Sequence, residues 1–402
     1  MPINKNYIIW SLVSVPILVG IFLIVQQFII KVGEKGVRTL FLQEKGPDPF
    51  FQNPPDVVKA VYFTSTTAGN EKRISHIIEL ANKSTLNAVV IDIKDFSGYV
   101  AYDSGISEVK KYKAERIDIK NVDGLIKKLH DNNIYVIARI TVFQDPVLAR
   151  ARPDWAVKNK YTGGLWRDRN GLAWINPIAS ASWDYYVSIA QDVVRRGFDE
   201  LNFDYIRFPS DGDMSALVFP GWPALRPVRQ SFSDGGSFSE GGDGKKLKSE
   251  IIREFYQYLR QSLPGVRLSA DLFGFVTTHT DDLGIGQIIE NAFASFDYIS
   301  PMVYPSHYPP TYLGFQNPAA HPYEVVYESM KGGIERLKAY KLKYPENKTQ
   351  FRPWLQDFNM GADYTQAMVE AEIKATQDAL GENYHGFMLW NARNVYHEGV
   401  FK

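Results

Sequence analysis

Hydrophobic and polar positions follow two alternating patterns over most of the 402-residue chain. From about residue 57 onward, a short run of β-branched and aromatic residues is followed by a polar turn, and then by apolar residues at helical spacing. This pattern predicts eight strands, at residues 58–64, 87–95, 134–143, 198–208, 266–273, 296–304, 350–357 and 386–391. Helices are expected between them, at residues 71–83, 121–132, 180–196, 245–262, 283–293, 322–341 and 364–380.

Nearly continuous apolar strands separated by helices are typical of a parallel sheet that is covered on both faces. Eight such units predict an α/β fold, a closed (β/α)8 TIM barrel over residues 56–402. No glycine-rich dinucleotide-binding loop follows the first strand, which argues against an open nucleotide-binding sheet. In a barrel of this kind, functional side chains lie at the carboxyl ends of the strands.

The amino-terminal segment carries a separate signal. Residues 7–30 contain no charge and can span the roughly 30 Å of a bilayer core as a helix. No small-residue cleavage site follows. We therefore predict an uncleaved signal anchor at residues 1–30, a linker at residues 31–55, and a protein held at the membrane through residues 7–30. The positive-inside rule does not decide the orientation, but the short amino-terminal tail favours a single-pass protein with an extracytoplasmic barrel.

Composition and motifs exclude several functions. Lysine plus arginine and aspartate plus glutamate both number 45, which argues against a nucleic-acid partner. The absence of cysteine removes thiol nucleophiles, thiolate metal sites and disulfides. Seven histidines form no metal-binding motif, and two of them, His76 and His130, are expected on helix surfaces. No nucleophile elbow or phosphate-binding loop is present, so we expect no metal and no cofactor.

Two acidic residues stand out on the predicted fourth and fifth strands. Period-two alternation places Asn202 and Asp204 on the inner face of one strand, and Ser269 and Asp271 on that of the next. A carboxylate inside a barrel is costly unless it is paired or catalytic. Two carboxyls across a cleft are what glycosidic hydrolysis requires, one as proton donor and one to attack the anomeric carbon or activate water. Asp204 and Asp271 are therefore the candidate catalytic residues.

The same carboxylates also fit structural ion pairs. Asp92 and Lys94 share a face of the second strand by alternation, and for Asp92 we prefer a pair with Lys94 over a role in function. Asp204 could pair with Arg139 or Arg207, but for Asp204 and Asp271 we prefer catalysis. Polar and aromatic residues at predicted strand ends and loops are the candidates for substrate binding: Asp92, Lys94, Arg139, Asn202, Arg207, Tyr304, His307, Gln356, Trp166, Trp222 and Trp390.

Residues 210–244 interrupt the repeating pattern with a long segment after the fourth strand. A long loop at that edge of a barrel is either a lid or binding loop, or an insertion without a role in the site. For the glycine- and serine-rich half, residues 233–244, both interpretations stay open. The half that contains Trp222 is expected to touch ligand, because sugar faces pack on aromatic rings. Trp354 is another aromatic candidate, although a place in the core is preferred for it.

Five segments together resemble the putative glycoside hydrolase domain family, a group of barrels distantly related to α-amylase-type glycosidases. They are residues 87–95, 202–209, 269–274, 300–308 and 352–356, and they cover the whole barrel. In related barrels the nucleophile ends strand four and the acid/base ends strand five, which implies Asp204 and Asp271. α-Amylase-type enzymes usually have arginine two residues before the nucleophile and glutamate as acid/base. This chain departs from that pattern with Asn202 and Asp271.

The sequence thus predicts a membrane-anchored glycoside hydrolase that acts on a polysaccharide or oligosaccharide, with a cell-envelope polysaccharide as the expected substrate. The alternative is a catalytically inactive carbohydrate-binding barrel tethered to the membrane. Inactive barrels keep aromatic residues but lose one carboxylate. Because both Asp204 and Asp271 are present, the enzyme is favoured.

Overall fold

The structure, a computed structural model, describes residues 54–221 and 247–402. The predicted signal anchor, nearly all of the predicted linker, residues 222–244 of the long loop, and Trp222 lie outside these ranges. Among the described residues, no helix is both long enough and apolar enough to cross a membrane. The membrane span predicted for residues 7–30 therefore stays a prediction.

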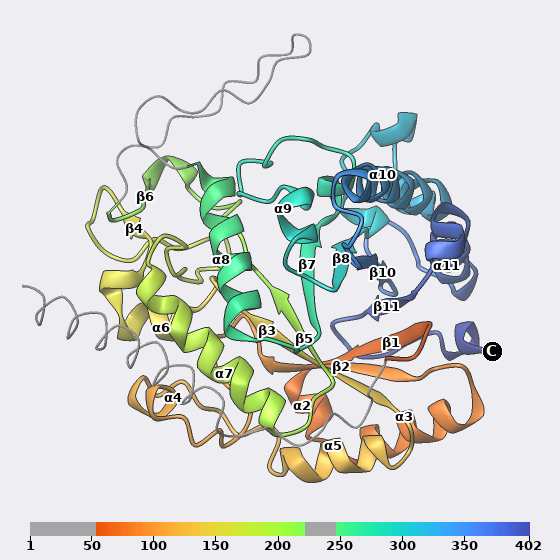
Figure 1. Ribbon diagram of the computed structural model, residues 1–402, viewed down its shortest axis with the longest axis horizontal. Helices are drawn as coiled ribbons and strands as arrows, with labels where there is room; N and C mark the ends of the chain where they lie inside the picture. Colours follow the sequence, from red (N-terminus) through yellow and green to blue (C-terminus); the bar gives the residue numbers. More distant parts are fainter. Residues whose placement is uncertain (1–53, 222–246) are drawn as a thin grey trace, which may run out of the picture. The chain divides into compact units, whose positions relative to one another are not determined.

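Eight parallel strand positions close into a barrel, as the sequence predicted (Figure 1). β1 pairs with β2 on one side and with β11 on the other, so the sheet has no free edge at the start of the barrel. The strands of the barrel are β1 (Val58–Phe63), β2 (Ala88–Lys94), β3 (Tyr135–Thr141), β5 (Glu200–Asp204), β7 (Leu268–Phe273), β8 (Tyr298–Met302), β9 (Gln350–Phe351), β10 (Trp354–Gln356) and β11 (Gly386–Trp390).

The seventh strand position is built from two short pieces. β9 pairs with β8, and β10 pairs with both β8 and β11. Pro353 lies between the two pieces and has no backbone N–H to donate to a neighbouring strand, which explains the interruption. The break nevertheless leaves Trp354 and Gln356 on the strand that completes the barrel.

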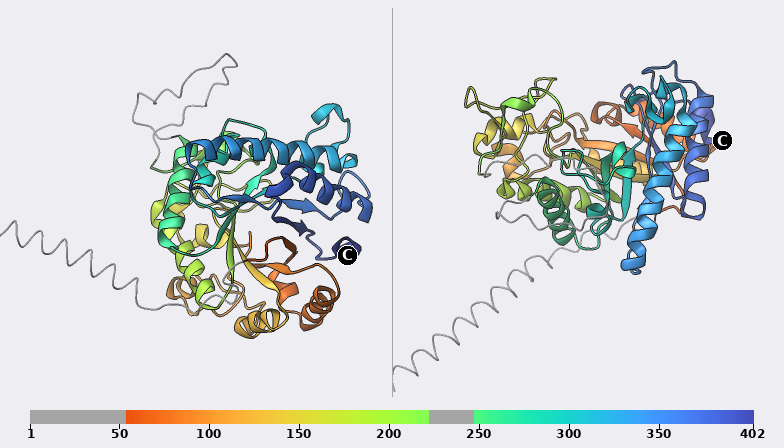
Figure 2. Two further views of the ribbon diagram at one scale, coloured as in Figure 1. Left: turned by 45° about the vertical axis from the view of Figure 1, so that its right-hand side comes forward. Right: turned by 90° about the horizontal axis from the view of Figure 1, so that it is seen from above.

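Helices form the outer layer around the strands (Figure 1). In α3 (Glu71–Lys83), Ile74, Ile77 and Ile78 form the buried stripe that a helical period predicts, and the Asn70 side chain caps the first turn. The long helices α10 and α11 pack side by side (Figure 2). The α-helices are α2 (Ser65–Ala68), α3 (Glu71–Lys83), α4 (Ser107–Lys111), α5 (Val122–His130), α6 (Pro146–Ala151), α7 (Trp183–Arg195), α8 (Lys248–Ser262), α9 (Ile289–Phe293), α10 (Pro322–Lys343) and α11 (Gln366–Leu380).

Two expectations about helices were wrong. The helix predicted over residues 283–293 is only α9, because Leu283, Gly284 and Gly286 adopt positive φ angles that a right-handed helix does not allow. His130 is not a surface residue. It is only 7% exposed, and its Nε2 lies 2.9 Å from Asp199 Oδ2.

The barrel interior has an apolar layer between two polar groups. Near the amino ends of β3, β5 and β8, Arg352 Nη1 lies 2.9 Å from Glu200 Oε1, and both side chains are fully buried. The guanidinium of Arg352 also lies over the ring of Tyr298. The apolar layer above this pair contains Val58, Ala60, Ala88, Val90, Ile137, Trp354 and Met388. The second polar group lies at the carboxyl ends of the strands and is the candidate site.

A small antiparallel sheet lies in the loops that follow the third and fourth barrel strands. β4 (Lys158–Asn159) comes from the first of these loops and pairs with β6 (Leu217–Val218) from the second. Part of the long loop predicted after the fourth strand is therefore ordered by pairing with its neighbour. Trp166 is only 1% exposed in this region, and its Nε1 donates to the backbone oxygen of Asp213 at 2.8 Å.

Candidate active site

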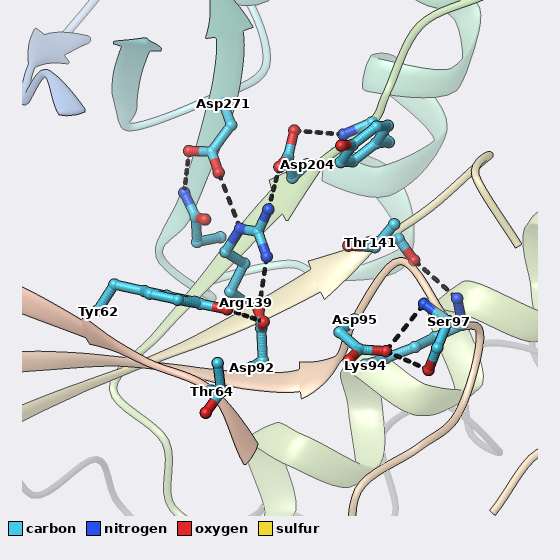
Figure 3. Close-up of polar contacts among 12 residues, drawn as sticks. Tyr62, Thr64, Asp92, Lys94, Asp95, Ser97, Arg139, Thr141, Asp204 and Asp271 are labelled. Carbon is cyan, nitrogen blue, oxygen red and sulfur yellow. Dashed lines mark hydrogen bonds and ion pairs between the residues drawn. The ribbon is translucent and has the colours of Figure 1, made fainter. Parts of the chain in front are cut away.

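Four charged side chains meet where barrel strands β2, β3, β5 and β7 end (Figure 3). They are Asp92, Arg139, Asp204 and Asp271. The strand registers place Arg139 beside Asp92 on one side and beside Asn202 on the other. All four side chains point into the barrel, as alternation predicted for Asp204 and Asp271.

Arg139 binds all three carboxylates through different nitrogens of one guanidinium (Figure 3). Its Nη1 donates to Asp92 Oδ1 at 2.6 Å, its Nη2 donates to Asp204 Oδ2, and its Nε lies 3.4 Å from Asp271 Oδ2. Because these nitrogens belong to one rigid plane, the carboxyls of Asp204 and Asp271 are held side by side. The ion pair between Asp204 and Arg139 that the sequence offered as an alternative is thus present.

Each carboxyl has a distinct set of further partners. Tyr62 Oη donates to Asp92 Oδ2. The backbone N–H of Tyr205 donates to Asp204 Oδ1 at 2.5 Å, and Tyr205 takes a left-handed φ of 53° that turns this N–H back toward the carboxylate. Asp271 Oδ1 accepts from Asn202 Nδ2 at 2.8 Å and from Trp354 Nε1 at 2.6 Å. The left-handed conformation of Tyr205 is rare outside glycine, and residues in rare backbone conformations cluster at functional sites.

The charges of the site are strongly perturbed. Burial, together with the negative charge of Asp204, raises the pKa of Asp271 to about 8. Burial also raises the pKa of Asp92, against the opposing effect of Arg139. Burial alone would lower the pKa of Arg139, but Asp92 and Asp204 hold it well above its usual value. The site therefore places a permanent cation beside a carboxyl whose pKa burial raises.

Aromatic side chains surround the charged group. Trp390 stacks on Tyr62 with ring centroids 3.9 Å apart, and the Arg139 guanidinium lies 5.0 Å from the Trp390 ring. Trp390 is half-buried, whereas Trp354 is buried in the barrel as preferred from the sequence. Tyr304 is buried, and Asp271 and Asp204 both add to the rise in its pKa, which burial causes in the first place. These rings give the site apolar walls that suit the faces of sugars.

The loops after β8 and β10 carry a small aromatic group next to Tyr304. The rings of His307 and Phe358 both meet Tyr304 edge-on, and His307 is exposed. Gln356 is fully buried between the two loops, where it accepts from the backbone N–H of Ser306 and donates to the oxygen of Phe358. Gln356 thus ties the loops together and does not present its amide at the surface.

Lys94 does not lie where the sequence placed it. The register between β2 and β3 shifts between Asp92 and Lys94, and this bulge turns Lys94 away from the inner face (Figure 3). Lys94 Nζ lies 2.9 Å from the oxygen of Thr141 and 2.9 Å from Asp145 Oδ2, with no exposed surface. The predicted pair of Asp92 with Lys94 was therefore wrong, because each has another partner.

Two other candidates lie apart from the four charges. Arg207 donates to the oxygen of Phe208 and to Ser210 Oγ, and its guanidinium lies over the rings of Trp174 and Tyr205. The ion pair of Asp204 is made with Arg139, not with Arg207. Trp166, buried in the loop region, is not an exposed stacking platform.

The two acids do not face each other across an open cleft, which is the arrangement that glycosidic hydrolysis requires. Asp204 is 4% exposed and Asp271 is 1% exposed, because Arg139 and Trp354 pack against them. Sequence reasoning also missed Tyr62 and Phe358. Tyr62 had a usable signal, since alternation from Val58 puts it on the inner face at the end of the first strand. Phe358 follows the seventh strand in an irregular segment that carries no periodic pattern.

No constellation of three or more histidine, aspartate or glutamate side chains suited to a metal ion is found in residues 54–221 and 247–402. The three aspartates that converge at the site surround the Arg139 guanidinium, which takes the place that a metal cation would occupy between them. One positive charge of the chain thus lies between them.

A closed parallel barrel with paired carboxyls at the carboxyl ends of adjacent strands is an arrangement that suits glycoside hydrolysis. Comparison with family models agrees. The chain belongs to the family described as the putative glycosyl hydrolase domain, whose model matches residues 60–396. The family predicted from the sequence is confirmed, and with it the class of putative glycosidase.

Several solved structures are similar to this chain. A hypothetical protein from Ruminiclostridium thermocellum is 41% identical over 57% of this chain and 99% of its own, with a TM-score of 0.44. The PgaB (BpsB) glycoside hydrolase domain from Bordetella bronchiseptica is 13% identical over 84% of this chain and 95% of its own, with a TM-score of 0.54. The glycoside hydrolase domain of PelA from Pseudomonas aeruginosa is 11% identical over 85% of this chain and 97% of its own, with a TM-score of 0.40. No curated protein sequence matches the chain.

Proposed function

We propose that this protein is a glycoside hydrolase that cleaves a cell-envelope polysaccharide, using Asp271 as general acid and Asp204 as nucleophile or general base. The observation that carries the proposal is the guanidinium of Arg139, which holds two carboxyls from adjacent strands side by side in different surroundings. The proposal extends to the membrane, where residues 7–30 would hold an extracytoplasmic barrel close to its substrate.

The proposed roles follow from the environment of each acid. Asp271, with a pKa of about 8, keeps a proton that it can donate to the oxygen of the glycosidic bond as that bond breaks. Asp204 accepts a hydrogen bond at each of its oxygens, from Arg139 at Oδ2 and from the Tyr205 N–H at Oδ1. An ionised Asp204 can stabilise the positive charge that develops at the anomeric carbon, and either attack that carbon or activate a water molecule.

Arg139 would have a positioning role. Its three contacts fix the distance between the acids, and its charge offsets the repulsion that would otherwise build up between Asp92 and Asp204. Trp390, stacked on Tyr62 beside the guanidinium, is the best-placed candidate to pack against a sugar ring. The carboxylate of Asp92 accepts hydrogen bonds from Arg139 and from Tyr62, which favours a role for Asp92 in orienting Arg139.

One observation favours the second candidate function, a carbohydrate-binding barrel without turnover. Asp204 and Asp271 are nearly covered, and Arg139 already occupies their oxygen atoms. A sugar can reach them only if neighbouring side chains move. A barrel in which these groups serve as a buried ion-pair network would still present Trp390 and His307 to a glycan.

A panel of glycans digested with the full-length protein separates the two functions. The enzyme proposal expects release of shorter products by the wild type and a loss of several orders of magnitude in Asp204→Asn, which removes the charge but keeps the shape. Asp363→Asn is the matched control, because Asp363 is an exposed aspartate in the segment that follows β10. Binding of a glycan with no product from any variant would end the enzyme proposal in favour of the binding barrel.

A further inference from the structure

A second feature with an evident ligand chemistry lies in the loops that follow β2 and β3. A hollow of about 550 Å³ opens between the carboxyl-terminal ends of α4 and α6. These two helices lie on the same side of the barrel (Figure 1). Four of the eight residues that line the hollow are cationic and none is acidic, and two more are tyrosines. The residues that matter are Lys111, Lys113, Arg150, Arg152, Tyr99 and Tyr112.

Three of the four cations are available to a ligand. Arg152 is paired with Asp154 at 2.5 Å and lies over the ring of Trp155. Lys111, Lys113 and Arg150 are exposed, and within the described ranges none of them forms an ion pair. Glu108, the acid nearest to Lys111 along α4, accepts from Ser107 Oγ at 2.6 Å, and Lys111 acts on it electrostatically without an ion pair. A hollow with three cations that form no ion pair has a local positive potential that attracts anions.

The backbone conformation of Lys113 also supports a binding role for this hollow. Lys113 follows the C-cap of α4 with a φ of 54°, in the left-handed conformation that glycine usually supplies at this position of a helix end. A side chain in that conformation is strained, and glycine would form the same turn without strain. The chain has a cation there instead, and that cation lines the hollow.

The walls of the hollow are fixed to the strands that carry the candidate active site. Asp145 caps α6 through the N–H of Leu148 at 2.8 Å and pairs with the buried Lys94 of β2. Asp92 lies two residues before Lys94, and Arg139 lies on β3, which leads into Asp145. The helix α6, which lines the hollow, is thus held by contacts with β2 and with the end of β3. These contacts lie at the end of the barrel where active sites are found.

We propose that this hollow is a subsite for an oxyanion group, a carboxylate or a phosphate, on the glycan that the active site binds. Lysine and arginine bind both groups by charge-assisted hydrogen bonds. Tyr99 and Tyr112 add half-buried aromatic side chains to the lining of the hollow, which suits a sugar that carries the anion. The inference rests on the proposed function, and it narrows the substrate to an acidic polysaccharide.

The test is binding by the full-length protein, measured calorimetrically with three oligomers of similar length. The probes are hexagalacturonate for carboxylates, a glycerol phosphate hexamer for phosphates, and cellohexaose as the neutral reference. The subsite variant combines Lys111→Gln, Lys113→Gln and Arg150→Gln. The matched control removes the same charges from exposed positions on α3, α8 and α10, with Lys83→Gln, Arg253→Gln and Lys338→Gln.

We expect one of the anionic oligomers to bind at least about tenfold more tightly than cellohexaose, and the subsite variant to lose that difference. The control variant should keep it. The oligomer that binds identifies the anionic group. Equal losses in the two variants would show a diffuse charge effect and overturn the subsite. Unchanged binding in the subsite variant would also overturn it, and would leave the cations the lesser role of interacting with the helix ends.

Two further outcomes separate this inference from the proposed function. Loss of anion binding in the subsite variant, with no glycan hydrolysed by the wild type, would keep the oxyanion subsite and end the hydrolase proposal. Hydrolysis of an acidic glycan with the same KM in the subsite variant and wild type would keep the hydrolase proposal and end the oxyanion subsite. Binding to phosphatidylglycerol vesicles that depends on the three cations, with neither oligomer bound, would contradict a glycan subsite.

Discussion

At the scale of single residues, Arg139 organises the candidate site. The α-amylase-type pattern has an arginine two residues before the nucleophile, where this chain has Asn202. In the structure Arg139 on β3 is the register neighbour of Asn202, and its guanidinium reaches Asp204 from there. A cation is therefore supplied to the carboxylate from the adjacent strand. The sequence named Arg139 as a candidate, but its place between three carboxylates depends on strand neighbours that alternation alone does not reveal.

Lys94 shows the limit of period-two reasoning. Alternation puts it on the face of Asp92, but a single bulge moves it into the layer of helices, and only the packing around Asp145 gives a reason for that bulge. The inward direction of Asp204 and Asp271 could be predicted because β5 and β7 have no such irregularity before these residues.

Lys94→Met tests the structural role directly. The substitution would leave the fully buried Asp145 without its cation, so we expect a loss of about 3–5 kcal/mol in the free energy of unfolding. Urea unfolding followed by circular dichroism measures it. If stability is unchanged and glycan binding weakens instead, Lys94 has the substrate-binding role that the sequence predicted.

The raised pKa of Asp271 makes stability depend on pH. An aspartate in the unfolded chain ionises near pH 4, whereas Asp271 in the folded protein ionises near pH 8. Its contribution is therefore complete below pH 4, falls as the pH rises from 4 to 8, and is flat above that. We expect the unfolding free energy of the wild type to decline over this range relative to Asp271→Asn, which cannot ionise. Parallel curves from pH 4 to 9 would show that Asp271 is already ionised in the fold.

At the scale of elements, the eight strand positions follow from hydrophobic runs, whereas their irregularities follow from particular residues. Pro353 splits the seventh strand, and the positive φ angles at Leu283, Gly284 and Gly286 shorten the helix before the sixth. The short helices α4 and α6 were not predicted, since five or six residues carry too little periodicity. These two helices line the hollow proposed as the oxyanion subsite, so the hollow could not be predicted from the sequence.

Gly386 begins the strand that closes the barrel. Its φ is +101°, and a Cβ atom built there would lie 1.8 Å from the backbone oxygen of Val58 on β1. Gly386→Ala must separate β11 from β1 at this point, so we expect a loss of stability beyond about 4 kcal/mol, or failure to fold. Gly284→Ala is the control, because Gly284 has a φ of +69° but open space around it. The control should lose only about 1–2 kcal/mol. Equal losses, measured by thermal unfolding, would refute the close contact.

At the scale of the whole molecule, the barrel is complete without its amino-terminal segment. β1 begins at Val58 and has a partner strand on each side, and β11 closes the barrel from the carboxyl-terminal end of the chain. Closure removes the exposed edges that would otherwise need a covering segment. The fold class could be predicted because eight repeats of one pattern leave few alternatives, whereas the burial of the site depends on side chains from distant repeats.

Deleting residues 1–45 should therefore yield a folded, soluble barrel. We expect a single cooperative thermal transition and the circular dichroism of a mixed α/β protein. The full-length protein should fractionate with membranes while the truncated protein does not. Recovery of the truncated protein only as aggregate would show that residues 1–45 pack against the barrel and contribute to its core.

The most direct test of the account is the leaving-group dependence of hydrolysis in Asp271→Asn. A general acid matters most when the departing oxygen is a poor leaving group, so kcat/KM for a natural glycan should fall by about 10²–10⁴-fold. Activated aryl glycosides of the same sugar should lose much less, while Asp204→Asn should lose activity on both. Equal loss on both substrates in Asp271→Asn, accompanied by a lower melting temperature, would show that Asp271 is a structural carboxyl and would contradict the account.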